Sequence, residues 1–169
     1  MKTNISFSPW ISWVNRNSLP GKDKPGVYLI GRFTLPPTSG PADPFDKHVV
    51  YIGESAGGRF QGRWRSFGRA AFEGKGRHRG GIRYRQKFGG DSSVVYVSIL
   101  LDEEIVKEFL EPGKCSFIDN ITSDVKVTDA IELDVLLQEI DDLLIKYVER
   151  RLILLYSITH GNRPPCNGD

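Results

Sequence analysis

Two stretches rich in β-forming residues flank a segment with four prolines, and this arrangement restricts how the first third of the chain can fold. The stretches are GVYLIGRFTL from Gly26 and HVVYIG from His48, and their β-branched and aromatic residues predict strands. The segment between them, PPTSGPADPFDK, forms neither a helix nor a central strand, because proline lacks the backbone N–H that both require. We therefore expect an antiparallel pair of strands joined by a long, proline-rich insertion at about 34–47.

The residues before this pair predict a short helix. In SPWISWVNRN, Ser8 is a good capping residue and a proline follows it, as is common in the first turn of a helix. Trp13 and Val14 are expected to share one face of this helix. The helix would form part of an N-terminal helical extension, about 1–24.

The residues after the pair predict a third strand and further helices. GRFQGRWRSFGRAAFEGKG predicts a helix whose apolar residues recur at steps of three and four: Phe60, Trp64, Phe67 and Ala71. GRHRGGIRYRQKFGG follows as a basic connector bounded by glycines, and SSVVYVSILLD predicts the third strand. DEEIVKEFLEPGK predicts a helix that ends at its Pro-Gly pair. A long apolar pattern from Thr128, with Tyr147 on its apolar stripe, predicts either a helix with a break or two packed helices.

Taken in order, these elements predict an α+β domain with a small antiparallel or mixed three-stranded sheet flanked by helices. The 169 residues suit one domain, 1–169, better than two. The longest apolar run, near Leu152–Ile158, is far shorter than a membrane-spanning helix, and no leader-like pattern opens the sequence. The two cysteines, Cys115 and Cys166, are expected to be free thiols in the reducing cytoplasm.

Charge is divided unevenly along the chain. Residues 54–90 carry ten lysines and arginines against two glutamates, whereas residues 101–145 carry thirteen acidic residues against three lysines. A basic segment of this kind favours a polyanion as the partner. Two other interpretations stay open: the two segments are solvated faces that pair with each other, or the acidic segment covers the basic groove of the same molecule.

Several common kinds of site are absent from the sequence. His48, His78 and His160, together with the two cysteines, lack the spacing of a zinc site. No glycine-rich loop ends in Gly-Lys-Ser/Thr, and no Gly-x-Ser-x-Gly stretch occurs, so neither a phosphate-binding loop nor a nucleophile elbow is expected.

Residues that are distant in the sequence could instead be gathered by the fold. Tyr28 and Tyr51 lie on neighbouring predicted strands, an arginine-rich helix follows, and Glu149 lies in an apolar helix within KYVERRLILLY. A phenol, a guanidinium and a carboxylate that holds a hard cation are the parts needed for metal-assisted hydrolysis of a phosphodiester. The same residues also fit cross-strand packing of the tyrosines and a surface charge cluster around the glutamate.

Five short stretches follow one another in the order PGVYLI, VVYIGES, RFQGRWRSF, YVERRLI and NRPPCN. This series resembles the GIY-YIG nuclease superfamily over roughly Lys24 to Asn167. The resemblance implies a GIY-YIG-like fold and a metal-dependent DNA endonuclease, of a stand-alone or restriction type, that hydrolyses phosphodiester bonds. It also implies DNA as the partner and one divalent metal, Mg²⁺ or Mn²⁺, as the cofactor. A restriction-type enzyme that cuts a palindromic site favours a homodimer.

The resemblance assigns catalytic roles to individual residues. Tyr28 and Tyr51 match the two tyrosines of the motif, and Tyr51 is preferred over Tyr28 as the proton acceptor. Arg63 matches the catalytic arginine, with Arg65 as the alternative if the loop before the helix shifts by two residues. Glu149 matches the glutamate that holds the metal.

Further positions are expected to support the site. Asn167 in PPCN matches the asparagine that supports the active site, with Asn162 as the alternative. Gly26 and Gly53 are expected to be structural glycines, and Gly53 lets the chain turn tightly after the second strand.

The basic segment is expected to lie along the phosphate backbone, so that binding weakens steeply with salt. The residues expected to bind nucleic acid are Arg65, Arg69, Lys75, Arg77, His78, Arg79, Arg83, Arg85 and Lys87. Trp64, Phe67 and Tyr84 serve either core packing or base contact. The alternative function is a non-catalytic nucleic-acid-binding module on the same scaffold.

Two positions depart from the pattern of the family. Glu54 stands where many members have a lysine, and Phe67 stands where some have a histidine one turn after the arginine. His78 either supplies an imidazole from the basic segment, contacts a phosphate or takes no part.

Overall fold

The strands β2 (Gly26–Arg32) and β3 (Val49–Glu54) form the predicted antiparallel pair, joined by the proline-rich loop. In this computed structural model, which describes residues 6–103, 105 and 130–168, the register places Tyr28 opposite Gly53 and Ile30 opposite Tyr51. The third predicted strand is β4 (Val95–Leu101), which pairs with the other side of β2. The chain is therefore α+β, as the sequence predicts.

The sheet has four strands rather than three, because a short strand forms where a helix is predicted. β1 (Ile11–Ser12) pairs with β4, so the strand order is β1-β4-β2-β3 and β3 is an edge. A 3-10 helix, η1 (Trp13–Ser18), follows it. Ser8 does not cap this helix, because the helix begins four residues later, after Ser12, and the Ser8 hydroxyl instead accepts from the Ile99 N–H at 3.0 Å.

The tryptophan of this N-terminal region anchors it to the core. Trp13 is buried, whereas its neighbour Val14 is 74% exposed, so the predicted common face is wrong. The helix is too short and too tightly wound for adjacent residues to share a face. The proposed helical extension at 1–24 is thus a strand followed by one 3-10 helix, within the part of the chain that is described.

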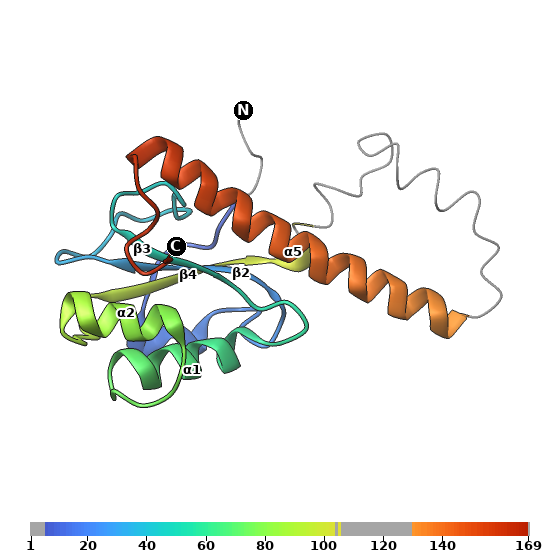
Figure 1. The fold of residues 1–169 in the computed structure, drawn as a ribbon, viewed down its shortest axis with the longest axis horizontal. Coiled ribbons are helices and arrows are strands. Elements are labelled where there is room, and N and C mark those ends of the chain that lie inside the picture. Colours follow the sequence, from blue (N-terminus) through green and yellow to red (C-terminus); the bar gives the residue numbers. More distant parts are fainter. Residues whose placement is uncertain (1–5, 104, 106–129, 169) are drawn as a thin grey trace.

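Helices cover both faces of the sheet, as Figure 1 shows: α5 (Ala130–His160) lies on one face, and α1 (Phe60–Ala71) with α2 (Arg79–Phe88) lies on the other. Alternation along β2 divides its side chains between two apolar clusters. Tyr28 and Ile30 join the cluster under α1 and α2, whereas Val27 and Leu29 join the one under α5.

α1 is the helix that the apolar spacing predicts, and its aromatic residues form the core. Phe60, Trp64 and Phe67 are all fully buried. Their role is therefore packing, and Tyr84 from α2 is buried with them, so none of these aromatic side chains is available for base contact.

The predicted connector at 76–90 is wrong, because it contains α2. The glycines of this segment do not mark a loop. They allow close packing of the helix or end it. A methyl group on Gly81 would lie 2.6 Å from the Phe67 carbonyl oxygen, so the absence of a side chain lets α2 approach α1 closely. His78 caps the helix by accepting a hydrogen bond from the Gly81 N–H, and Gly89, at φ 74°, ends it.

α5 is one continuous helix of 31 residues, and the predicted break does not occur. Its buried face is formed by Ile145, Val148, Leu152 and Tyr156. Tyr147, which the sequence places on the apolar stripe, is half exposed instead. No helix among the described residues combines the length and apolar character that crossing a bilayer demands. The predicted helix at 102–114 lies outside the described residues except for positions 102, 103 and 105.

We expect Gly81→Ala to lower the free energy of unfolding by about 1–3 kcal/mol, because its methyl group collides with the backbone of α1. Gly62→Ala is the matched control: it lies inside α1 with nothing within 4 Å of the added methyl. This substitution should raise stability by about 0.5–1 kcal/mol. Urea unfolding of both variants tests the packing, and equal stabilities would contradict it.

Candidate active site

The two motif tyrosines lie side by side on the face of the sheet that carries α1. Their ring centroids are 5.9 Å apart; the Tyr28 side chain is fully buried, and Tyr51 is 9% exposed. Gly53 makes room for both, because a methyl group there would lie 2.6 Å from Cζ of Tyr28 and 2.5 Å from Cε1 of Tyr51. Gly53 is thus structural, as predicted, but it is needed for this close approach rather than for a turn. Gly26 is also a structural glycine, because its φ of 144° is one that residues with a side chain rarely adopt.

Arg63 of α1 is held against the end of β3 by Glu54. Its Nε donates to the Glu54 carbonyl at 3.0 Å, and its guanidinium lies 3.5 Å from the Glu54 carboxylate. Burial alone lowers the pKa of Arg63, but the nearby phenols of Tyr28 and Tyr51 and the Glu54 carboxylate reverse this, so the net shift is upward. The guanidinium stays charged beside both tyrosines. Arg65, the alternative, is exposed on α1.

Glu149 reaches the same place from α5, around the free edge of β3. Burial raises the pKa of Glu149 to about 7, the charge of Glu54 adds to the rise, and Arg150 and Arg63 oppose it. Its charge in turn acts on both Tyr51 and Tyr28. The structure therefore brings Tyr28, Tyr51, Arg63 and Glu149 into one electrostatic neighbourhood.

The Glu149 carboxyl fits the single metal that the family resemblance implies. No hydrogen bond or ion pair engages it among the side chains that the structure describes. A partly buried carboxylate without a partner is costly, and a divalent cation supplies the missing charge. The described residues hold no group of three or more His, Cys, Asp or Glu ligands. One carboxylate, with water and substrate oxygens completing the shell, is a usual arrangement for Mg²⁺.

Both phenols are held in their protonated form. Burial, together with the charge of Glu149, raises the pKa of Tyr51 to about 12, although Arg63 opposes the shift. Burial also raises the pKa of Tyr28, well above its usual value. At neutral pH each tyrosine is therefore a hydrogen-bond donor, and Tyr51 accepts a proton only when its own proton leaves.

His78 lies next to Tyr51, with ring centroids 5.6 Å apart. Burial, reinforced by the charge of Arg63, lowers the pKa of His78 to about 4, so the imidazole is neutral. Its Nδ1 accepts from the Gly81 N–H, which assigns the proton to Nε2, a buried atom without a partner in the described structure. Neither ring nitrogen is hydrogen-bonded to Tyr51 among the described contacts, so the role of His78 stays a prediction.

Asn167 closes the free edge of β3. Its side-chain oxygen accepts from the Ile52 N–H at 2.8 Å, and its nitrogen donates to the Ile52 carbonyl at 2.6 Å. The Cys166 N–H donates to the Val50 carbonyl at 2.8 Å. The tail thus pairs with the backbone on both sides of Tyr51, as another strand would. Asn162, the alternative, is exposed and lies in a hollow along α5.

Apart from His78, described above, the predicted nucleic-acid-binding residues divide into three groups. Arg79 and Arg83 line a hollow beside Tyr51, together with Arg163, which the sequence analysis missed because it lies outside the basic segment. Arg85 instead donates to the Phe72 carbonyl at 3.2 Å and is turned toward the end of α1. The others lie on the exposed surface of α1, α2 and the loop between them: Arg65, Arg69, Lys75, Arg77 and Lys87.

The acidic segment can be described only in part. Most of it, residues 106–129, lies outside the described residues, and so does the predicted cover over the basic groove. Asp142 of α5 accepts a hydrogen bond from the Gly57 N–H at 2.6 Å. This acidic residue therefore anchors the loop between β3 and α1.

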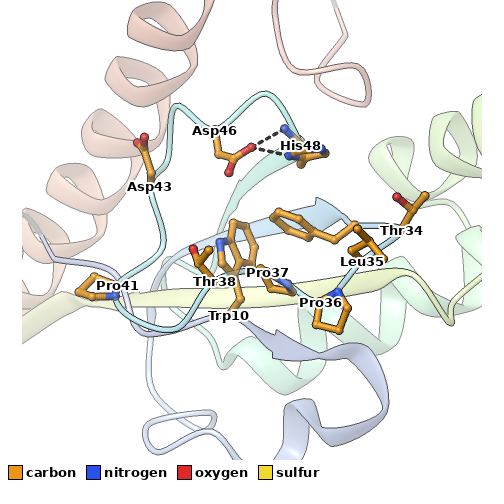
Figure 2. Close-up of a pocket in the computed structure, with 11 residues that line it drawn as sticks. Trp10, Thr34, Leu35, Pro36, Pro37, Thr38, Pro41, Asp43, Asp46 and His48 are labelled. Atoms are coloured by element: carbon orange, nitrogen blue, oxygen red, sulfur yellow. Dashed lines mark hydrogen bonds and ion pairs between the residues drawn. The ribbon is translucent and has the colours of Figure 1, made fainter.

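A separate hollow of about 340 Å³ opens beneath the proline-rich insertion, at the opposite end of β2 and β3 (Figure 2). Trp10 and Phe33 form its aromatic floor, with ring centroids 5.1 Å apart. Asp46 at its rim is hydrogen-bonded to His48 at 2.8 Å. None of the predicted site residues lines this hollow.

Comparison of the chain with family models, with curated proteins and with solved structures returned no match. The likeness to GIY-YIG nucleases therefore rests on the motif residues of the sequence.

The raised pKa of Glu149 predicts how stability depends on pH. The folded protein binds more protons than the unfolded chain between the ordinary pKa of 4.5 and the folded value of about 7, so stability falls as pH rises through this window. Glu149→Gln removes this titration. The stability of the variant relative to the wild type should increase by about 1–2 kcal/mol between roughly pH 5 and pH 8. Glu139→Gln, at an exposed position of the same helix, is the control. A difference that stays constant with pH would show that Glu149 is not buried as described.

Proposed function

We propose that this protein is a metal-dependent DNA endonuclease with a GIY-YIG-like fold. The observation that carries the proposal is the meeting of Tyr28, Tyr51, Arg63 and Glu149, which come from two strands and from helices on opposite faces of the sheet. No structural need explains a half-buried carboxyl without a partner beside a charged guanidinium. A site that binds a cation and a phosphate does explain it.

Each group has a chemical role in hydrolysis of a phosphodiester. Glu149 holds the Mg²⁺ or Mn²⁺ ion, which when bound polarises a phosphate oxygen and lowers the pKa of water. Arg63 stabilises the negative charge that develops on the phosphoryl oxygens. Glu54 keeps this guanidinium in place, so the role of the lysine seen in many family members is not reproduced here.

Tyr51 positions the attacking water and takes part in moving its proton. With a pKa of about 12, Tyr51 does not provide a phenolate at neutral pH. Neutralising the charge of Glu149 removes the second largest cause of this raised pKa and leaves Arg63 to favour the ionised form.

The second candidate is a DNA-binding module without catalytic activity. The basic hollow beside Tyr51 favours it, because that hollow needs no metal. Against it stands Glu149, since a negative charge in a surface that only binds DNA repels the ligand.

We expect Glu149→Gln to abolish cleavage of plasmid DNA in Mg²⁺ or Mn²⁺ while DNA binding is kept or improved. Arg63→Ala should lower kcat by roughly 10²–10³-fold, because it removes stabilisation of the transition state. Arg65→Ala is the matched control on the same helix, and it should raise KM with little change in kcat. Agarose-gel nicking assays and single-turnover kinetics measure these effects.

Two results would count against the proposal. Wild-type protein that binds DNA but cuts neither plasmid nor branched DNA with either metal supports the binding module. If Arg65→Ala loses cleavage and Arg63→Ala retains it, the catalytic arginine is wrongly assigned.

A further inference from the structure

A hollow of about 160 Å³ opens beside Tyr51, and Arg63 is not among the residues that line it. α2 forms one wall with Arg79 and Arg83, and the C-terminal tail forms the other with Arg163. Tyr51 belongs both to this hollow and to the proposed catalytic group.

Two of the three guanidinium groups of this hollow are held in place by the tail. Arg163 donates to the Gly168 carbonyl at 2.7 Å. The guanidinium of Arg83 packs so closely on Gly168 that a methyl group there would lie within 2.0 Å of its nitrogens. The tail itself is fixed to β3 through Asn167, as described above. Fixed guanidiniums lose little side-chain entropy when a ligand binds.

Within the described residues, no carboxylate compensates the charges of the hollow. Arg79 and Arg83 lie one turn apart on α2, where like charges repel. No carboxylate is within ion-pair distance of either of them, or of Arg163, among the side chains that the structure describes. Arg63, by comparison, is paired with Glu54. Three uncompensated guanidiniums around so small a space match a single tetrahedral anion with several acceptor oxygens.

We propose that this hollow binds one backbone phosphate of the DNA strand, next to the phosphate that is cut. This inference rests on the proposed function. In it, α2 and the tail position the DNA strand relative to Tyr51. The strand is then held at two points near Tyr51, by this hollow and by Arg63. Base identity plays no part in this contact, so it serves every DNA sequence equally.

The test is the salt dependence of DNA binding by the triple variant Arg79→Gln, Arg83→Gln and Arg163→Gln. The probe is a short fluorescent DNA duplex of mixed sequence, titrated with EDTA present so that no cleavage occurs. Each phosphate neutralised contributes about 0.9 to the slope of log K against log salt. One shared phosphate predicts that the slope falls by about 1 in the triple variant, although three charges are removed.

The matched control is Lys22→Gln, Lys47→Gln and Lys146→Gln, which removes the same net charge away from the hollow and should leave the slope nearly unchanged. A slope that falls by about 3 means separate phosphates and overturns the shared site, and an unchanged slope overturns phosphate binding there. Thermal unfolding checks that the triple variant is folded. If it is not, Arg163→Gln alone should weaken binding several-fold relative to Lys47→Gln, and equal affinities overturn the proposal.

The result separates the two proposals. A slope that falls by about 1 in a protein that never cuts DNA supports the phosphate site and rejects the nuclease. A protein that cuts DNA, with an unchanged slope in the triple variant, keeps the nuclease and rejects the phosphate site.

Discussion

The free edge of β3 is the constraint on which the candidate site depends. Among the described residues no further strand pairs there, and Arg63 from α1 on one face and Glu149 from α5 on the other both act on Tyr51 of this strand. An open edge also favours aggregation, because its unpaired backbone N–H and C=O groups can pair with another chain. Asn167 satisfies them with one side chain, which leaves the adjacent space open where a whole strand would fill it. The tail therefore protects the sheet without covering Tyr51.

The sequence predicts the parts of this fold that are encoded locally. The strands around Tyr28 and Tyr51 and the helix of Phe60 follow from residue type and periodicity. α2 could not be found this way, because its glycines at 80 and 81 read as loop signals while their role is tertiary. In the same way Gly53 is identifiable as a structural glycine, but its reason, the space taken by two phenols, depends on cross-strand register.

The candidate site also contains residues that the sequence predicts and residues that only the folded structure reveals. The motif order gives Tyr51, Arg63, Glu149 and Asn167, and the structure brings these residues together around β3. Arg163 carries no local signal, since a single arginine in a short tail is common. Only the path of the tail back to β3 puts it beside α2. A charge cluster whose residues are adjacent in the sequence can be found from local composition. A cluster whose residues meet only when the chain folds cannot.

The departure at position 54 explains why one carboxylate of the site is free and the other is not. Both oxygens of Glu54 are engaged, one by the Ala56 N–H and one by Arg63. Glu54 is thus committed to the loop and to the guanidinium. Glu149 has no such partner, and the nearby charge of Glu54 makes its ionised form still less favourable. A cation is attracted to the carboxylate with unused lone pairs, while the fixed charge of Glu54 strengthens that attraction at a distance. The glutamate at position 54 therefore keeps the arginine in place and leaves Glu149 as the carboxylate without a partner among the described residues.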